Sequence, residues 1–241
     1  MRVLVIADVH GNAAALDTVL SQPHDHLICL GDIVGYGPSP AACVDAIRAQ
    51  PGFVVQGNHD RAIADNCSPG CRPAFSWLAD ATRHIALHEL GPERLTFLGA
   101  LPRWARVLID EVDALCLHAT PTNPLYRYLG AETSAWGQEV ASVNTPLLLV
   151  GHTHLQFGLQ CESTRVINPG SVGQPKDADP RAAFAIIEDG EISLHRVAYD
   201  VEATVRGLEE SDTPRDAVAA LARLLRTGTP PPAQEPTTNT V

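Results

Sequence analysis

The run Leu147-Leu148-Leu149-Val150 is followed at once by Gly151-His152-Thr153-His154. Four consecutive apolar residues predict a strand that is buried on both faces. Alternate residues of an extended chain point to the same side, so the imidazoles of His152 and His154 should project together from the end of that strand. The role of this pair depends on which other side chains the fold brings to the same place.

Four other predicted strands end in the same manner. They span residues 2–7, 27–30, 53–56 and 114–117, and the side chains that follow them are Asp8, His10, Asp32, Asn58, His59 and His118. Predicted helices at 13–20 and 40–49 alternate with the first three strands, which indicates a parallel sheet whose carboxyl ends lie along one edge. A single acid or histidine after a strand is usually a cap or a turn former, whereas the whole set predicts a binding site.

The donor types narrow the chemistry of this site. Carboxylate, amide and imidazole donors without a positioned thiolate suit Mn²⁺, Fe, Zn²⁺, Co²⁺ or Ni²⁺ better than Ca²⁺. The donors are too many for one tetrahedral ion, so we expect two divalent transition-metal ions roughly 3.5–4 Å apart, with manganese as the first candidate. Asp32 is the natural bridge, because Gly31 and Gly35 let its loop approach closely. Such a pair lowers the pKa of a shared water to about 7, and the bridging hydroxide then attacks an ester, most readily at phosphorus.

The rest of the chain surrounds this site. An all-helical insertion over about 62–101, with helices at 75–90 and 93–98, is expected to form a small cap beside it. The other predicted elements are strands at 104–109, 165–167, 184–188 and 192–196 and helices at 133–142, 201–208 and 217–225. The last two strands are predicted to form a hairpin about Asp189-Gly190. We expect one domain over 1–226 and a disordered Thr/Pro-rich tail over 227–241.

Composition limits the partners. The chain has 241 residues, is 45% hydrophobic and carries a formal net charge of −11. Membranes and nucleic acids need clustered Lys and Arg, so neither is expected as a partner, whereas bound cations would still admit a small phosphorylated substrate. The six cysteines lack disulfide-framework spacing, and no signal peptide or membrane span is recognisable, which favours a reducing cytoplasm. A homo-oligomer is compatible with the sequence.

The strand-end residues fall into five motifs: Asp8-x-His10, Gly31-Asp32-x-x-Gly35, Gly57-Asn58-His59-Asp60, His118 and Gly151-His152-x-His154. Their order and spacing over residues 1 to about 200 resemble the calcineurin-like metallophosphoesterase superfamily. Asp8-Val9-His10-Gly11-Asn12, Gly35-Tyr36-Gly37-Pro38 and Asn168-Pro169-Gly170-Ser171 resemble its prokaryotic branch, which includes diadenosine-tetraphosphatase-like and protein-phosphatase-like enzymes. The resemblance implies an α/β fold, a four-layer α/β/β/α sandwich with two sheets face to face and helices outside.

The resemblance also implies roles for the motif residues. Asp8, His10, Asp32 and His154 would hold the first metal, and Asp32, Asn58, His118 and His152 would hold the second. His59 would stay off the metals and either protonate the leaving oxygen or stabilise charge on the phosphoryl group. The implied function is a dinuclear metal-dependent phosphoesterase.

One departure from the family pattern affects the expected substrate. Protein serine/threonine phosphatases of the superfamily continue the second motif with Asp and Arg, where this chain has Gly35 and Tyr36. Asp60 could replace the missing Asp as orienter of the catalytic imidazole, and Arg61 or Arg127 could replace the missing Arg as phosphate grip. The departure favours a phosphodiester or nucleotide substrate over a phosphoprotein.

A further residue, Asn12, is either a helix N-cap or a phosphate donor, and could be both.

Two alternatives stay open. A DNA or RNA nuclease of the same superfamily is disfavoured by the acidic balance and by the absence of a basic stripe. A non-catalytic interaction scaffold would be expected to lose ligands around the Asn-His pair, and Asn58 and His59 are both present.

Overall fold

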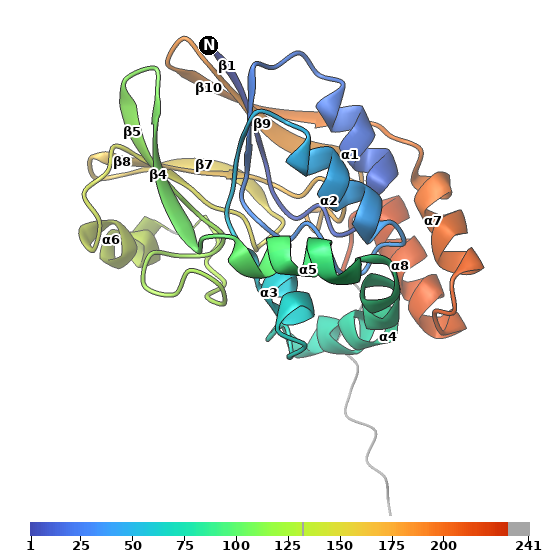
Figure 1. Ribbon diagram of the computed structural model, residues 1–241. Coiled ribbons are helices and arrows are strands. Elements are labelled where there is room, and N and C mark those ends of the chain that lie inside the picture. Colours follow the sequence, from blue (N-terminus) through green and yellow to red (C-terminus); the bar gives the residue numbers. More distant parts are fainter. Residues whose placement is uncertain (132, 231–241) are drawn as a thin grey trace, which may run out of the picture.

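Two five-stranded sheets packed face to face form the centre of the molecule (Figure 1). The structure is a computed structural model and describes residues 1–131 and 133–230. Most of the tail expected at 227–241 lies outside the described residues, although Thr227 itself is the last residue of a helix.

The first sheet carries the parallel strands predicted from the amino-terminal alternation. Its order is β10-β9-β1-β2-β3, with β1 and β2 parallel, β2 and β3 parallel, and β9 antiparallel to both of its neighbours. The strands are β1 (Arg2–Ile6), β2 (His26–Cys29), β3 (Gly52–Val54), β9 (Ala182–Glu188) and β10 (Glu191–Val197). The β9–β10 hairpin turns at Asp189-Gly190, both at positive φ, as the sequence predicted.

The second sheet has the order β4-β5-β6-β8-β7. Its strands are β4 (Trp104–Ile109), β5 (Val112–Leu117), β6 (Leu147–Leu149), β7 (Gln156–Cys161) and β8 (Thr164–Pro169). Parallel pairing of β5, β6 and β8 brings the ends of these three strands together at the same edge. The sequence prediction missed β7, an edge strand that pairs with β8, although its apolar residues Phe157, Leu159 and Cys161 alternate with Gln156, Gly158 and Gln160; a glycine inside such a short run weakens the strand signal.

Helices cover the outer faces, which confirms the four-layer sandwich. Helices α1 (Ala13–Leu20) and α2 (Pro40–Arg48) pack on the first sheet through a cluster that includes Leu16 and Ile47. Helix α6 (Thr133–Ala141) packs on the second sheet, where Trp136 is fully buried. Between the sheets lies an apolar cluster that includes Val5 and Leu149. This buried layer fixes the two sheets relative to each other, and with them the strand ends that carry the motifs.

The region expected as a helical cap contains α4 (Pro73–Glu89) and α5 (Gly91–Ala100). Helix α4 shares an apolar cluster with α7 (Val201–Glu210) and α8 (Arg215–Thr227), so the insertion is tied to the carboxyl-terminal helices. A preceding helix, α3 (Asn58–Ala64), was not predicted from the sequence. Helix α3 has only seven residues, too few for an apolar period to be recognised. Among the described helices none is long and apolar enough to cross a membrane.

Candidate metal centre

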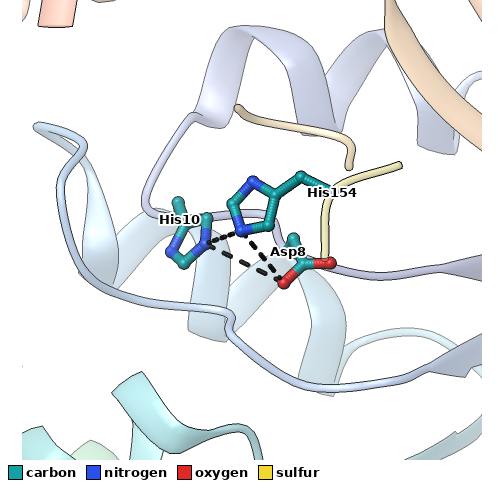
Figure 2. A group of neighbouring side chains, drawn as sticks. All are labelled: Asp8, His10 and His154. Atoms are coloured by element: carbon teal, nitrogen blue, oxygen red, sulfur yellow. Dashed lines mark hydrogen bonds and ion pairs between the residues drawn. The ribbon is translucent and has the colours of Figure 1, made fainter. Parts of the chain in front are cut away.

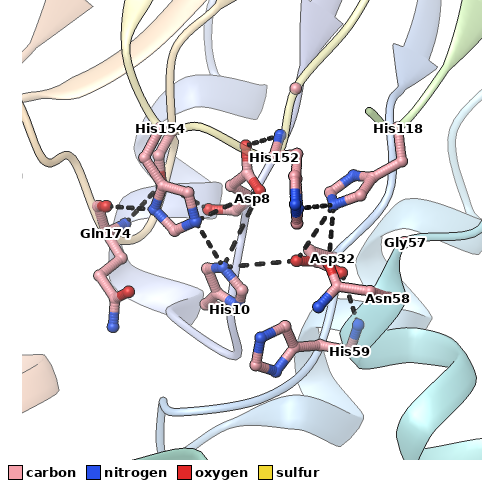
Figure 3. A network of polar contacts seen from close by, with 12 residues as sticks. Asp8, His10, Asp32, Gly57, Asn58, His59, His118, His152, His154 and Gln174 are labelled. Carbon is pink, nitrogen blue, oxygen red and sulfur yellow. Dashed lines mark hydrogen bonds and ion pairs between the residues drawn. The ribbon is translucent and has the colours of Figure 1, made fainter. Parts of the chain in front are cut away.

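Two groups of buried donors meet at the edge where the parallel strands end. The first consists of Asp8, His10 and His154 (Figure 2), and the second of Asp32, His118 and His152. Within each group the ligand atoms lie within 4.8 Å of one another. Figure 3 shows both groups side by side, with β1, β2, β5 and β6 each supplying at least one member from the turn that follows the strand.

Each aspartate divides its two oxygens between the backbone and the site. Asp8 Oδ2 accepts from the backbone N–H of His152 at 3.0 Å, and Asp32 Oδ1 accepts from that of His59 at 2.8 Å. The second oxygens face the rings: Asp8 Oδ1 lies 3.4 Å from His154 Nε2, and Asp32 Oδ2 lies 3.3 Å from His118 Nε2. Asp32 Oδ2 is also 3.8 Å from His10 Nε2, so it stands between the two groups, as expected for a bridge.

Backbone carbonyls orient the imidazoles of His10, His118 and His154. His10 Nδ1 contacts the carbonyl of Val34 at 3.2 Å, and His154 Nδ1 contacts that of Gln174 at 2.6 Å. A carbonyl only accepts, so the N–H sits on Nδ1 and the Nε2 lone pair points into the site; this arrangement is characteristic of metal-binding histidines. The two Nε2 atoms are 3.1 Å apart, a contact of two lone pairs that a cation between them would relieve.

Unpartnered polar atoms support the same conclusion. Asp8 Oδ1 and His152 Nε2 are buried without a hydrogen-bond partner among the described residues. A buried polar atom without a partner costs about 1–3 kcal/mol, and more if it is charged. Divalent cations, one in each group, would supply the positive charge that faces the Asp8 carboxylate and the histidine lone pairs. The donor set therefore fits the metals that the motifs imply.

The backbone of the site is strained at the same residues. Asp8, His10, Asp32, His152 and His154 all have φ between +49° and +65°, in the left-handed region. Such conformations cost on the order of 1–3 kcal/mol each for side chains other than glycine and persist where the surroundings fix them. Gly57 is required beside them, because a Cβ there would lie 2.1 Å from Asp32 Oδ1.

Burial dominates the electrostatics of the chain without ions. It raises the pKa of Asp8 to about 7 and lowers the pKa of His10 and His154 well below the usual value. At His118 burial also acts to lower the pKa, but the carboxylate of Asp32 outweighs it and raises the pKa to about 9. The proton on His118 thus supplies positive charge next to Asp32, and a bound cation would replace it.

Asn58 and His59 begin helix α3 at the rim of the second group. Asn58 Nδ2 donates to the carbonyl of Pro69 at 2.7 Å, which leaves Oδ1 facing His118 Nε2 at 3.1 Å. The ring of His59 packs against Tyr36 with centroids 4.7 Å apart, and a Cβ on Gly35 would lie 2.8 Å from its Nδ1. Gly35 and Tyr36, which replace the Asp-Arg of the protein phosphatases, therefore hold His59 by packing.

Asp60, which was expected to orient His59, has its carboxylate hydrogen-bonded to backbone N–H groups. Asp60 Oδ2 accepts from the backbone N–H groups of Asp32 (2.8 Å) and Gly57 (3.0 Å), and Oδ1 accepts from those of Ile33 (2.8 Å) and Val34 (3.2 Å). The buried carboxylate thus joins the start of α3 to the loop that carries the bridging aspartate. The hydrogen bonds of Asp60 therefore fix the loop that carries Asp32.

The three residues proposed to bind substrate are occupied elsewhere. Asn12 Oδ1 caps α1 through the N–H of Ala15 and accepts from Thr204, while its Nδ2 donates to Gly173 and Tyr199.

The two arginines are paired with protein groups. Arg127 is paired with the buried carboxylate of Glu139 and Arg61 with Asp65, and Arg61 also donates to the hydroxyl of Tyr126 at 2.6 Å. Asn12 therefore acts as a helix cap, and each arginine has a carboxylate partner in this structure.

Sequence analysis missed residues that the fold brings to the site from distant segments. Tyr128 stacks on the ring of His152 with centroids 3.8 Å apart, and Lys176 Nζ lies 3.3 Å from His154 Nε2. The sequence assigned no role to Tyr128 or to Lys176. Both lie in connections after strands, where spacing alone does not determine direction.

The layers and the donor set define a metal-dependent hydrolase of the α/β sandwich type. The chain belongs to the calcineurin-like phosphoesterase superfamily, whose domain it matches over residues 1–190, and it is a phosphoester hydrolase. It is similar to a metallophosphoesterase from Sphaerobacter thermophilus, with 32% identity and a TM-score of 0.81 over 95% of this chain and 99% of that one.

Two further relatives agree with this placement. An uncharacterized protein of Methanocaldococcus jannaschii is 31% identical over 83% of this chain and 88% of its own length. The phosphodiesterase YfcE of Escherichia coli is 23% identical over 80% of this chain and 91% of its own. The family resemblance seen in the five motifs is thereby confirmed.

Proposed function

We propose that this chain is a dinuclear metal-dependent phosphoesterase that hydrolyses phosphodiester or nucleotide-type substrates. The observation that carries the proposal is the pair of buried three-donor groups, with the carboxylate of Asp32 standing between them. A structural site for one ion would need only one such group and would be closed on all sides.

The proposed ligands follow the two groups. Asp8, His10, Asp32 and His154 would hold one ion, and Asp32, Asn58, His118 and His152 the other. When bound, two such ions supply a water of lowered pKa and positive charge that clamps the phosphoryl oxygens. The protein contributes the fixed spacing, because every ligand is buried and most are anchored by a backbone hydrogen bond.

His59 is proposed to bind the reacting phosphoryl group. Burial lowers the pKa of its imidazole to about 4, so the ring is neutral at pH 7 and carries a single N–H. A neutral imidazole can donate that hydrogen to a phosphoryl oxygen or to the leaving oxygen, where it stabilises developing charge. Since its Nδ1 lies against Gly35, Nε2 is the nitrogen directed away from that loop.

The proposed preference for diesters rests on which cationic side chains could bind the substrate phosphate. A phosphomonoester carries one more negative charge than a diester, and the family's protein phosphatases grip it with an arginine that this chain replaces with Tyr36. Arg61 and Arg127 do not substitute for it, because both are paired with protein carboxylates. The phosphodiesterase name of the YfcE relative agrees with this preference. We also propose a small phosphorylated substrate and a cytoplasmic location, where the six cysteines would stay reduced.

The test is hydrolysis of bis-p-nitrophenyl phosphate by protein loaded with Mn²⁺, then with Fe²⁺, Co²⁺, Ni²⁺ or Zn²⁺. His59→Asn should lower kcat by about 10²- to 10⁴-fold without loss of metal. His152→Ala and His154→Ala should each lower the metal content, because they belong to different ions. His88→Ala, an exposed histidine on α4, is the matched control and should behave as wild type. A wild-type protein that is inert with every metal would refute the proposal.

A further inference from the structure

A cavity of about 510 Å³ opens beside the metal centre. Its lining includes Arg72, Phe75, Tyr128, Thr153, Leu155 and Lys176, and among the described residues no carboxylate lines it. The walls come from the insertion, from the loop after β5, from the histidine motif, from the segment after β8 and from Pro230 after α8. Five separate parts of the chain therefore close around one space.

The cavity adjoins both donor groups. On one side Tyr128 stacks on His152 at 30° between ring planes. On the other side the half-buried Lys176 reaches His154 with its ammonium group. Thr153, which separates the two histidines in the sequence, lies in the wall itself. A substrate whose phosphoryl group sits on the metal centre would extend the rest of its body into this space.

Aromatic rings hold two cations at this cavity. The ammonium of Lys176 lies 4.0 Å from the centroid of Phe75, and the guanidinium of Arg72 lies 4.4 Å from the centroid of Tyr128. The Tyr128 ring thus contacts both His152 of the metal centre and the guanidinium of Arg72.

Arg72 and Lys176 do not stabilise the fold through ion pairs with carboxylates of the described residues. Neither Arg72 nor Lys176 forms an ion pair with a carboxylate in the described part of the chain, unlike Arg61 and Arg127. In a protein of net charge −11, two unpaired cations that line one cavity without a carboxylate create a local site for anions. A lysine supplies a point charge and an arginine a planar fork, both suited to phosphate oxygens.

We propose that Arg72 and Lys176 form an anion subsite that holds a second phosphoryl group of the substrate, beyond the one that is hydrolysed. The inference rests on the proposed function and narrows its substrate class to phosphodiesters that carry an additional phosphate. Tyr128 serves as the spacer that sets Arg72 away from the metal centre, and its own faces are covered, so it does not stack on a base.

The test compares two esters that differ by one phosphate: thymidine 5′-(p-nitrophenyl phosphate) and its 3′-phosphorylated form. The variants are Arg72→Gln and Lys176→Met, the latter keeping the apolar stem on Phe75. Arg103→Gln removes one exposed positive charge elsewhere and is the matched control. Metal content is measured for every variant, so that altered loading is recognised.

Wild type should prefer the 3′-phosphorylated ester. Arg72→Gln should lower kcat/KM for that ester by about fivefold to tenfold and leave the other within about twofold. Lys176→Met also removes the contact to His154, so it should lower kcat/KM for both esters, and by the larger factor for the 3′-phosphorylated one. Binding of thymidine 3′,5′-bisphosphate to the metal-loaded protein, measured by calorimetry, should weaken in Arg72→Gln, whereas binding of thymidine 5′-phosphate should not. Arg103→Gln should match wild type throughout.

The outcomes separate the two proposals. Hydrolysis of both esters by wild type with equal loss in the variants, or with no loss, would overturn the subsite and leave the phosphoesterase intact. Failure of wild type to hydrolyse either ester with any of the metals would overturn the phosphoesterase and the subsite with it.

Discussion

Replacement of Gly35 by alanine tests how this chain holds His59 without the aspartate used by the protein phosphatases. The added Cβ would lie 2.8 Å from His59 Nδ1, whereas an ordinary contact begins at 3.4 Å. The imidazole or the loop must therefore move by about 0.6 Å. Since productive geometry tolerates about 0.5 Å and a misplacement of about 1 Å can cost 10²-fold, we expect kcat to fall by about 10- to 100-fold.

The substitution also strains the backbone. Gly35 has φ of +95°, and a side chain in the left-handed half of φ space costs about 1–2 kcal/mol of folding stability. Gly91 offers a matched control, because its φ is +60° and nothing lies within 4 Å of the Cβ that alanine would add. Gly91→Ala should lose about 1 kcal/mol and keep full activity.

The assay measures kcat on bis-p-nitrophenyl phosphate at saturation, metal content, and the free energy of unfolding from urea titration. Gly35→Ala should keep both metals, because the backbone N–H of His59 and the Asp32 carboxylate are untouched. If Gly35→Ala retained more than half of the wild-type kcat while losing as much stability as Gly91→Ala, packing against Gly35 would not position His59.

Three other predictions concern the surroundings of the site. Asp60→Asn should lower the free energy of unfolding by about 2–4 kcal/mol, because the amide NH₂ would face backbone N–H donors that the carboxylate now satisfies; a urea titration showing a loss below about 1 kcal/mol would contradict this. Arg127→Gln should leave KM within about twofold and lower the free energy of unfolding by about 1 kcal/mol, because the buried Glu139 loses its cation. A raised KM would indicate that Arg127 contacts the substrate. Removal of metal by a chelator should lower the melting temperature, and readdition of Mn²⁺ should restore it. The expected loss of stability is about 2.7 kcal/mol for each site whose metal had been present at 100 times its Kd. An unchanged melting curve would argue against binding at these donors.

The sequence predicted which residues meet at the site. Apolar runs ending in Asp, Asn or His identify buried strands and their carboxyl ends, and parallel pairing places those ends together, so Asp8, Asp32 and His118 could be grouped before any contact was known. The same local patterns gave the parallel core of the first sheet and the β9–β10 hairpin.

The sequence predicted where the polar side chains lie along the chain, but it did not predict which partners they point to. Asp60 and Arg127 have the right chemistry near the right motifs, but their partners, the loop after β2 and the buried Glu139, come from distant segments. Lys176 and Arg72 lie far apart in sequence and in loops, where no period constrains the side chains. The ends of buried apolar runs are local properties of a sequence, so they predicted the parallel strands and the donor set. The hydrogen-bond partners of isolated polar residues depend on how the layers pack, so only the tertiary structure decided which cations lack a carboxylate partner among the described residues.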